Sequence, residues 1–476
     1  MSRHSQPPAR PFPLPRASPR TASQWIGQTK RLLLPDHHPA SVAHRLFNFH
    51  DRPDLGFNEG KGTVDFNRTI DLDSVGKGGV PMPTTVELFG GTMMSPVPNP
   101  YPVYKRLRDE NPVALVEGIF GEHYLVTRYD DALRVLRDAS TFSARANARG
   151  IGLVMGRTIL EMEGPEHVRM RRLITPALTP RALRRGSLIE RIRSTADEVI
   201  DSFADRGTAD IVREFAFSFP IRVFAQQFLD LTKEDAERFH HWALDLIGVA
   251  DDPPKAFAAA QAIVDYMSPV VRERRTNPGD DLISALATAE IDGMHLSDEE
   301  ILSFCRLLLP AGAETTYRLI GSTLFALLTE PGLLARVANH RPLLEAVIEE
   351  TLRWESPVQY VSRETTRVVE LGGVQIPPRA FVSVALGSAN RDERRFPDPD
   401  TFDPDRSTEG HLAFGFGEHY CAGTHLARIE AFTAINAILD RLLDLSRHPE
   451  CTGKIVGLAF RSPDSLRVRF RTQSQI

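Results

Sequence analysis

The chain has 476 residues, a formal charge of −5 and a pI near 6.3, which gives no overall signal for binding nucleic acid or an anionic membrane. Its three cysteines are too few and too scattered for a disulfide framework or a zinc cluster. The sequence has no run of about 18 apolar residues and no signal-peptide core. We therefore expect a globular protein of the reducing cytoplasm, without a membrane anchor.

The first 94 residues differ in composition from the rest of the chain. Residues 1–40 are rich in Pro, Ser, Arg and His, with no acidic residue before Asp36. They predict a disordered tail, with an organelle transit peptide or a polyproline ligand as the open alternatives. Residues 41–94 carry many glycines without clear periodicity and predict a partly irregular extension. The main domain is expected to span residues 95–476.

Apolar residues recur at helical spacing through most of this domain, and strand patterns are short. The fold class predicted is therefore mainly α with a minor β-sheet region. The predicted helices span residues 102–111, 130–136, 187–203, 233–249, 255–274, 280–287, 297–328, 344–354 and 421–442. The predicted strands are a hairpin of 114–117 with 123–127, and residues 366–371, 381–385 and 466–470.

The predicted helix over residues 297–328 is unusually long and apolar on most sides, so we expect it to cross the centre of the protein. Pro310 cannot donate a backbone hydrogen bond and Gly312 weakens the helix, which predicts a kink or an opened turn. Glu314 and Thr315 would then meet a freed carbonyl around ordered water. The alternative is an ordinary core helix with Glu314 in a salt bridge.

A glycine-jointed loop leads into the last predicted helix and carries Cys421. Gly415 and Gly417 allow close approach of a flat, bulky group, and Gly423 follows the cysteine. Unpaired N–H groups and the helix dipole would favour a thiolate at Cys421, which makes it a candidate ligand for haem iron. The alternative is a small buried hydrophobic side chain beside a plain turn.

The pattern Phe414-x-x-Gly417-x-His419-x-Cys421-x-Gly423 resembles the haem-ligand loop of the cytochrome P450 family. The resemblance implies the P450 fold and haem b as cofactor. It makes Cys421 the iron ligand, with Phe414 shielding the sulfur and His419 bonding a haem propionate. Four motifs in the family's order extend the resemblance over about residues 95–470.

Three other motifs carry this resemblance. The middle of the long helix resembles the family's oxygen-binding helix, in which Glu314 and Thr315 would deliver protons, with Ala311 and Gly312 against the haem. Glu350, Arg353 and Arg406 resemble a buried structural network that holds the thiolate loop. Three further residues are implied to bind the propionates, namely His167, Arg171 and Arg363.

The resemblance implies a monooxygenase that inserts one atom of dioxygen into an apolar small molecule, most simply by hydroxylation. Because the sequence shows no flavin or iron–sulfur domain, a separate ferredoxin and an NAD(P)H-dependent ferredoxin reductase are expected to supply electrons.

Residues 144–162 would form a lid, in which Arg145 or Arg149 could hold a substrate carboxylate. The residues expected to face the pocket are Val358, Tyr360 and Val361. The rivals are a peroxide-driven enzyme, a non-catalytic haem sensor or carrier, and a zinc site of His411, His419, Cys421 and His425.

Overall fold

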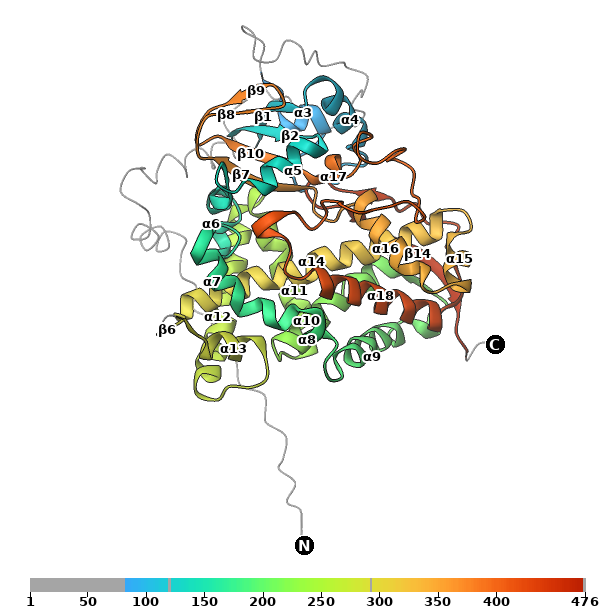
Figure 1. Ribbon diagram of the computed structural model, residues 1–476. Coiled ribbons are helices and arrows are strands. Elements are labelled where there is room, and N and C mark those ends of the chain that lie inside the picture. Colours follow the sequence, from blue (N-terminus) through green and yellow to red (C-terminus); the bar gives the residue numbers. More distant parts are fainter. Residues whose placement is uncertain (1–81, 119–120, 292, 474–476) are drawn as a thin grey trace. The chain divides into compact units, whose positions relative to one another are not determined.

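The computed structural model describes residues 82–118, 121–291 and 293–473, which Figure 1 draws in colour. These residues all belong to one unit of the chain, which begins at Thr69. The predicted tail of residues 1–40 and the extension up to residue 81 lie outside the described residues. Residues 85–89, within the segment expected to be partly irregular, form a short helix whose Leu88 and Phe89 pack into a core with Tyr104.

Helices make up most of the described structure, as predicted. Their bounds are α3 Thr85–Phe89, α4 Tyr101–Glu110, α5 Tyr129–Arg137, α6 Gly152–Met155, α7 Gly164–Ile174, α8 Pro180–Leu183, α9 Leu188–Asp201, α10 Phe219–Phe228, α11 Lys233–Ile247, α12 Pro253–Thr276, α13 Leu282–Thr288, α14 Asp298–Thr329, α15 Leu333–Asn339, α16 Leu343–Trp354, α17 Leu386–Ala389 and α18 Thr424–Arg441.

The strands form one larger sheet and several small ones. The larger sheet has the order β1-β2-β10-β7-β3, in which β10 pairs in parallel with β2 and the other neighbours are antiparallel. The strand bounds are β1 Val113–Gly118, β2 Gly121–Val126, β3 Phe142–Ser143, β4 Thr208–Asp210, β5 Glu290–Ile291, β6 Met294–His295, β7 Tyr360–Thr365, β8 Val369–Leu371, β9 Val374–Ile376, β10 Phe381–Ala385, β11 Leu443–Arg447, β12 Ile455–Val456, β13 Ser462–Pro463 and β14 Arg467–Arg471.

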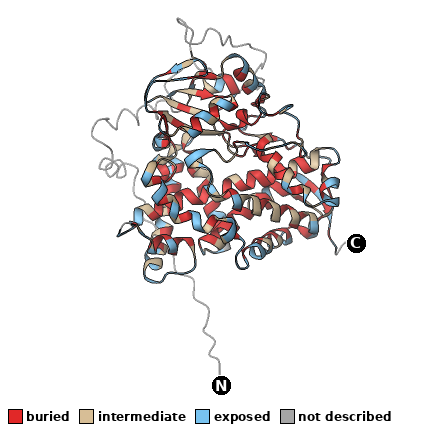
Figure 2. Ribbon diagram, in the orientation of Figure 1, coloured by how far each residue is buried: buried red, intermediate tan, exposed pale blue. Residues whose placement is uncertain are grey.

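Helix α14 lies at the centre of the helical layer, with α10, α11, α12, α16 and α18 packed against it (Figure 1). Buried residues run along most of its length (Figure 2). Its start is fixed locally, because Ser297 accepts from the backbone N–H of Glu300 and the Glu300 carboxylate accepts from the N–H of Ser297. The prediction of a long central helix is confirmed.

Two predicted elements were wrong in part. Residues 366–371 were expected to form a strand, but the chain turns at residues 366–368 and only Val369–Leu371 is a strand. The preceding residues Tyr360–Thr365 form β7, which the sequence did not predict. The last long helix begins at Thr424 rather than at Cys421. Cys421 therefore lies in the loop, three residues before the helix.

Candidate active site

The loop before α18 holds Cys421 by its backbone. The Cys421 N–H donates to the carbonyl of Phe414 at 3.0 Å, which closes the loop between them. Gly415 and Gly417 have φ angles of 71° and 76°, in the left-handed region that favours glycine. A Cβ on Gly417 would lie 2.6 Å from the carbonyl oxygen of Leu136, so a side chain would also be blocked there. The glycines thus let the loop turn and rest on α5.

Solvent reaches the Cys421 side chain, although protein surrounds it on most sides. Burial raises the pKa of its thiol, and the backbone N–H of Gly423 and the charges of Arg171 and Arg428 oppose that rise only in part. The expectation that the helix start would favour the thiolate was therefore wrong for the protein alone, since burial outweighs it. A metal cation at this position would supply the missing positive charge.

The zinc alternative does not fit the described residues. Among residues 82–118, 121–291 and 293–473, no group of three or more His, Cys, Asp or Glu side chains is placed to hold a metal ion. His411 instead contacts the Glu349 carboxylate at 3.2 Å. A single cysteine beside a basic cluster is a donor set for a metal that brings its other ligands with it, as haem iron does.

The predicted Glu-Arg-Arg network is confirmed in its contacts. Arg353 donates from Nε and Nη2 to the two oxygens of Glu350, at 2.7 and 2.6 Å, and both side chains are fully buried. Arg406 Nε lies 3.1 Å from the same carboxylate. Arg353 also donates to the carbonyls of Asn390, Pro399 and Thr401. The network thus ties α16 to the segment that leads into the Cys421 loop.

Basic side chains from three parts of the chain meet beside this loop. The rings of His167 on α7 and His419 in the loop are 4.4 Å apart between centroids. Arg171, one turn after His167, donates to the carbonyl oxygens of Glu418 and Tyr420. The charge of Arg363 on β7 acts on His419. The structure therefore brings together the four predicted residues.

The charges of Glu163 and Glu418 oppose the lowered pKa values in this cluster only in part. Burial lowers the pKa of His167, of Arg171 and of Arg363, the last to about 10. Burial and then the charges of Arg363, His167 and Arg171 lower the pKa of His419 to about 3. Both ring nitrogens of His167 and Nε2 of His419 are buried without a hydrogen-bond partner. Glu163, whose charge acts on Arg363, forms its ion pair with Arg145. Two haem propionates would supply the missing anionic acceptors, so these residues fit the group.

Helix α14 presents a solvent-accessible stretch in the middle of its buried length. Ala311 is exposed and Thr315, one turn later, is partly exposed. The helix runs unbroken through Pro310, so the opened turn predicted there is not seen. The Thr315 hydroxyl donates to the Ala311 carbonyl at 3.1 Å. The alcohol predicted to handle protons therefore lies on the accessible face of the helix.

Gly312 has a packing reason that the sequence did not reveal. A Cβ at this position would lie 2.7 Å from Cδ2 and 2.9 Å from Cγ of Phe224 on α10. The missing side chain therefore lets α10 approach α14 closely. Whatever Gly312 contributes beside a haem, its direct role in the described structure is helix packing.

We expect Gly312→Ala to destabilise the protein. The new methyl group would overlap the Phe224 ring, at a cost of about 1–3 kcal/mol. This exceeds the gain of about 1 kcal/mol that alanine brings to a helix interior. Gly321→Ala on the same helix is the matched control, because its nearest neighbour would be Pro463 at an ordinary 3.5 Å. Urea unfolding should show a lower free energy of unfolding for Gly312→Ala and no loss for Gly321→Ala. An equal gain in the free energy of unfolding for both variants would contradict the packing argument.

Glu314 is buried and held by two partners. His240 Nε2 on α11 lies 2.7 Å from Oε1, and Arg318 Nη2 lies 3.3 Å from Oε2. The salt bridge considered as the plain alternative is therefore present. Arg318 could have been predicted, since it follows Glu314 by four residues on one helix face. His240 lies 74 positions away in the chain, and no local signal joins it to Glu314.

The predicted substrate-side residues have different outcomes. Residues 144–162 form two short helical turns, Ala144–Arg149 and Gly152–Met155, and contact α14 and α12 through the second. Arg145 pairs with Glu163 and Arg149 with Glu364, so each already has a carboxylate partner. Tyr360 instead bonds the hydroxyl of Tyr104 and packs on a separate core cluster. The expectation that Tyr360 faces the substrate pocket was therefore wrong.

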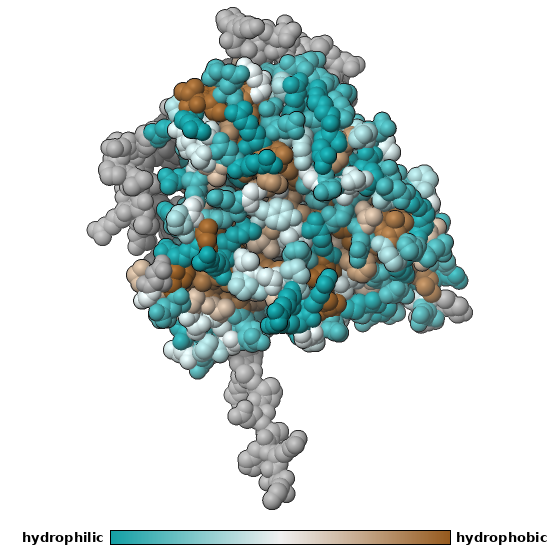
Figure 3. Space-filling model, in the orientation of Figure 1, coloured by the Kyte–Doolittle hydropathy of each residue, from teal (hydrophilic) through white to brown (hydrophobic). Residues whose placement is uncertain are grey.

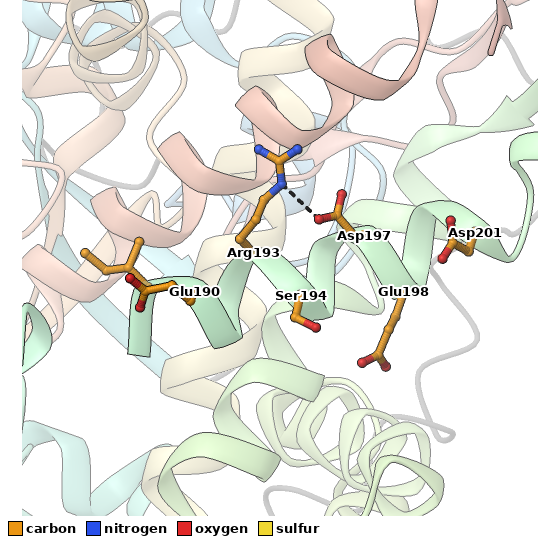
Figure 4. Close-up of a pocket in the computed structure, with 7 residues that line it drawn as sticks. Glu190, Arg193, Ser194, Asp197, Glu198 and Asp201 are labelled. Atoms are coloured by element: carbon orange, nitrogen blue, oxygen red, sulfur yellow. Dashed lines mark hydrogen bonds and ion pairs between the residues drawn. The ribbon is translucent and has the colours of Figure 1, made fainter. Parts of the chain in front are cut away.

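The surface of the described structure has two hollows away from residues 144–162. One of about 550 Å³ follows α9, where Arg193 pairs with Asp197 at 3.1 Å and the other polar side chains are spread along one helix (Figure 4). Because its polar groups do not converge, it does not form a catalytic site. The other, of about 440 Å³, borders the Cys421 loop and is lined in part by Arg137, Phe416 and Tyr420. The second therefore lies at the outer side of the loop.

A second ion-pair group, which was not predicted from the sequence, lies beside the Cys421 loop. Arg428 on α18 and His411 both contact the carboxylate of Glu349. Burial would raise the pKa of Glu349, but hydrogen bonds from Arg428 and His411 lower it to about 2. The Arg428 guanidinium also lies 4.6 Å from the centroid of the Phe414 ring. This group supports the loop from outside the buried network.

Comparisons with known proteins agree with these features. The family described as Cytochrome P450 matches residues 80–446. Cytochrome P450 107B1 of Saccharopolyspora erythraea is 39% identical over 385 residues, covering 77% of this chain and 90% of that protein. Cytochrome P450 monooxygenase PikC of Streptomyces venezuelae is 37% identical over 366 residues, covering 73% and 85%. The structure of CYP109E1 from Bacillus megaterium in complex with testosterone is 32% identical, with a TM-score of 0.70 over 78% of this chain and 99% of that one.

The surface adds one further observation. Among the described helices, none combines the length and the apolar character that crossing a membrane requires. The face seen in Figure 3 is mostly hydrophilic, with small and separate hydrophobic patches.

Proposed function

Because the chain belongs to the cytochrome P450 family, we propose that it hydroxylates an apolar small organic molecule at a haem iron held by Cys421. Family membership makes the protein a haem-dependent monooxygenase that works with redox partners. Bound haem supplies the activation of dioxygen, of which one atom enters the substrate and the other leaves as water. The remaining chemistry belongs to residues of this chain.

The buried basic cluster carries this proposal. The residues are His167, Arg171, Arg363 and His419, which lie beside the Cys421 loop with three ring nitrogens buried and unpartnered. They would bind the two propionates, and Cys421 would then donate its sulfur to the iron from the adjoining loop. Phe414 is packed beside the start of α18 and would cover the sulfur on one side. This donor set accounts for bases that would otherwise be costly to bury.

Thr315 and Glu314 are proposed to move the protons that oxygen cleavage requires. The Thr315 hydroxyl lies on the accessible face of α14, and Glu314 is its neighbour in sequence but is buried. A buried acid next to an accessible alcohol can pass protons from the protein side to the reaction side. This pair also favours dioxygen over peroxide as the oxidant, because peroxide already carries the protons.

An apolar substrate is supported by the apolar side chains of the predicted lid, whose helix α6 contacts α14. Val154 and Met155 of α6 and Leu308 of α14 belong to the main apolar core, and Ile151 packs against it. The arginines that could have held a substrate carboxylate are paired within the protein. CYP109E1, a relative of known structure, was crystallised with testosterone, which is an apolar polycyclic compound. A compound of that polarity is the proposed substrate class.

A separate acidic ferredoxin, reduced by an NAD(P)H-dependent reductase, is the proposed electron donor. Four exposed arginines lie between the end of α7 and the residues after α8, and no ion pair joins them to a described residue; they are Arg172, Arg181, Arg184 and Arg185. Burial, and then the charges of Arg428 and Arg184, lower the pKa of His425 on α18, so the charge of Arg184 reaches the helix that follows Cys421. A basic surface of this kind attracts an acidic partner and raises its rate of association.

The test is a binding screen followed by turnover. Purified holoprotein is titrated with a steroid, a terpenoid and a fatty acid, and an apolar compound is expected to shift the spin state of the iron. That compound should be hydroxylated in the presence of NADPH, ferredoxin and reductase, and not with hydrogen peroxide alone. If all apolar compounds fail to shift the spectrum, the proposed substrate class is wrong. Full turnover with peroxide alone would overturn the proposed use of dioxygen.

The basic surface can be tested in the same assay. Replacing Arg184 and Arg185 together by glutamate should lower the rate at limiting ferredoxin and leave substrate binding unchanged, because both side chains are exposed. Arg213→Glu, on a distant part of the sequence and paired with Asp210, is the control. An unchanged ferredoxin dependence would show that the donor does not use this surface.

A further inference from the structure

A buried polar group joins three elements around Glu314. His240 on α11 and Glu314 on α14 are each 1% exposed, and the His240 Nε2 lies 2.7 Å from Glu314 Oε1. Arg318 holds the other carboxylate oxygen and also donates to Ser462 Oγ at 3.2 Å on β13. The carboxylate is therefore held from α11 and, through Arg318, from β13.

The hydrogen bonds define what each group does. A carboxylate only accepts, so His240 must donate from Nε2. Its other ring nitrogen, Nδ1, is buried without a partner, so Nε2 makes the one hydrogen bond of the ring. Arg318 supplies the positive charge that the carboxylate requires. The charged groups around His240 in these contacts are thus Glu314 and Arg318, and Tyr317 lies nearby at 5.8 Å between ring centroids.

The ring of His240 is fixed in orientation as well as in distance. It stacks on Phe217 with centroids 3.5 Å apart and planes 16° from parallel. This stack and the bond to Glu314 leave the imidazole little freedom to rotate. The Nε2–H of His240, on α11, is thus directed at one oxygen of the Glu314 carboxylate on α14.

Stability alone is a weak reason for such a group. Buried ion pairs often contribute no more than apolar side chains of the same size would, because their desolvation is costly. Here a histidine, a glutamate and an arginine are buried in the helical core where α11 packs on α14. A group that orients a functional acid is a better reason for these residues.

We propose that His240 is a positioning residue for Glu314. It holds Oε1 by its Nε2–H while Arg318 holds Oε2, so that the carboxylate keeps one orientation. Because His240 belongs to α11, the orientation of the acid depends on where α11 packs against α14. The inference rests on the proposed function of Glu314 in proton delivery and adds a residue that acts through it.

Two variants separate the hydrogen bond from the stack. His240→Gln keeps an N–H that can reach Glu314 but loses the aromatic ring, and His240→Phe keeps the ring against Phe217 but loses the N–H. The first readout is the infrared carboxylate band of Glu314, assigned by its loss in Glu314→Gln. The positioning role predicts that His240→Phe shifts this band and that His240→Gln restores it. An unshifted band in His240→Phe would overturn the contact itself.

The second readout is turnover of the apolar compound that gives the largest spin-state shift, with NADPH, ferredoxin and reductase. His240→Phe should lower the rate of product formation by about tenfold or more, as expected for losing a hydrogen bond to a charged group. Hydrogen peroxide released per NADPH should rise, and the dissociation constant for the compound should stay the same. His240→Gln should recover most of the rate.

Each other outcome is decisive. If His240→Phe shifts the band but keeps normal turnover, the contact exists and the positioning role is wrong, while the proposed monooxygenase function stands. If both variants lose turnover equally, an N–H group at this position does not restore the function, and the positioning role is again wrong. If the wild-type protein oxidises no apolar compound, the proposed substrate class fails, and the infrared result still decides whether His240 orients Glu314.

Discussion

Replacing Cys421 by serine is expected to lower oxygenation by more than about a hundredfold, because it removes the proposed iron ligand itself, and supporting residues of metal sites alone are worth about 10–100-fold. Serine keeps the size of the side chain but offers a hard and protonated oxygen in place of a soft thiolate. The measurement is the Soret shift that carbon monoxide produces after reduction, together with product formation. Both should be lost.

Cys451→Ser is the matched control for this variant. Cys451 is partly buried in the segment after β11, where its sulfur accepts the N–H of Arg467 at 3.3 Å, and it has no contact with the loop of Cys421. It should keep the spectral shift and turnover. The fold of Cys421→Ser can be checked by far-ultraviolet circular dichroism, since the loop backbone bond to Phe414 does not involve the sulfur. Normal turnover of Cys421→Ser would show that Cys421 is not the iron ligand.

Elements with local signals were predicted closely. The central helix was predicted over residues 297–328 and spans Asp298–Thr329, because Ser297 and Glu300 form its capping box within one turn. The predicted hairpin and the strand Phe381–Ala385 were also confirmed. In each of these the apolar pattern and its boundary lie within the same short segment.

Elements that depend on distant partners were predicted less well. The strand predicted over residues 366–371 was placed by its β-branched residues, but β7 lies just before it because Tyr360–Thr365 pair with β10 and β3. Local propensity cannot reveal which residues have a neighbouring strand. The start of α18 was misplaced for a related reason, since Cys421 is held by Phe414 rather than by helical bonds.

The same division applies to the candidate site. The motifs located Cys421, the basic cluster and the Glu350 network because each is a short pattern or a pair on one helix face. The sequence could not reveal that His240 reaches Glu314, or that Gly312 faces Phe224, because both contacts join helices far apart in the chain. The pKa of the Cys421 thiol was predicted in the wrong direction, because burial by distant segments outweighs the local helix effect.

The largest loss of stability is expected from Arg353→Ala. Arg353 is fully buried and uses all five of its N–H donors, two on Glu350 and three on the carbonyls of Asn390, Pro399 and Thr401. Alanine would remove the Arg353 donors from the carbonyls of Asn390 and Pro399 and one of the two guanidinium partners of the buried Glu350 carboxylate. Breaking a buried pair in this way costs about 3–5 kcal/mol. Urea unfolding of the purified holoprotein should show this loss, with release of haem at lower urea.

The stability that Arg353 contributes depends on the geometry of its donors as well as on its charge. Two further variants separate these contributions. Arg353→Lys keeps the charge, but an ammonium group has three donors in place of five, so we expect it to recover only part of the stability. Arg336→Ala removes an exposed arginine whose Nη2 contacts both carboxylate oxygens of Asp405, at 2.9 and 2.8 Å. It should cost no more than about 1 kcal/mol, because solvent screens an exposed pair. If Arg353→Ala unfolded at the same urea concentration as Arg336→Ala, the buried network would not be what holds the Cys421 loop in place.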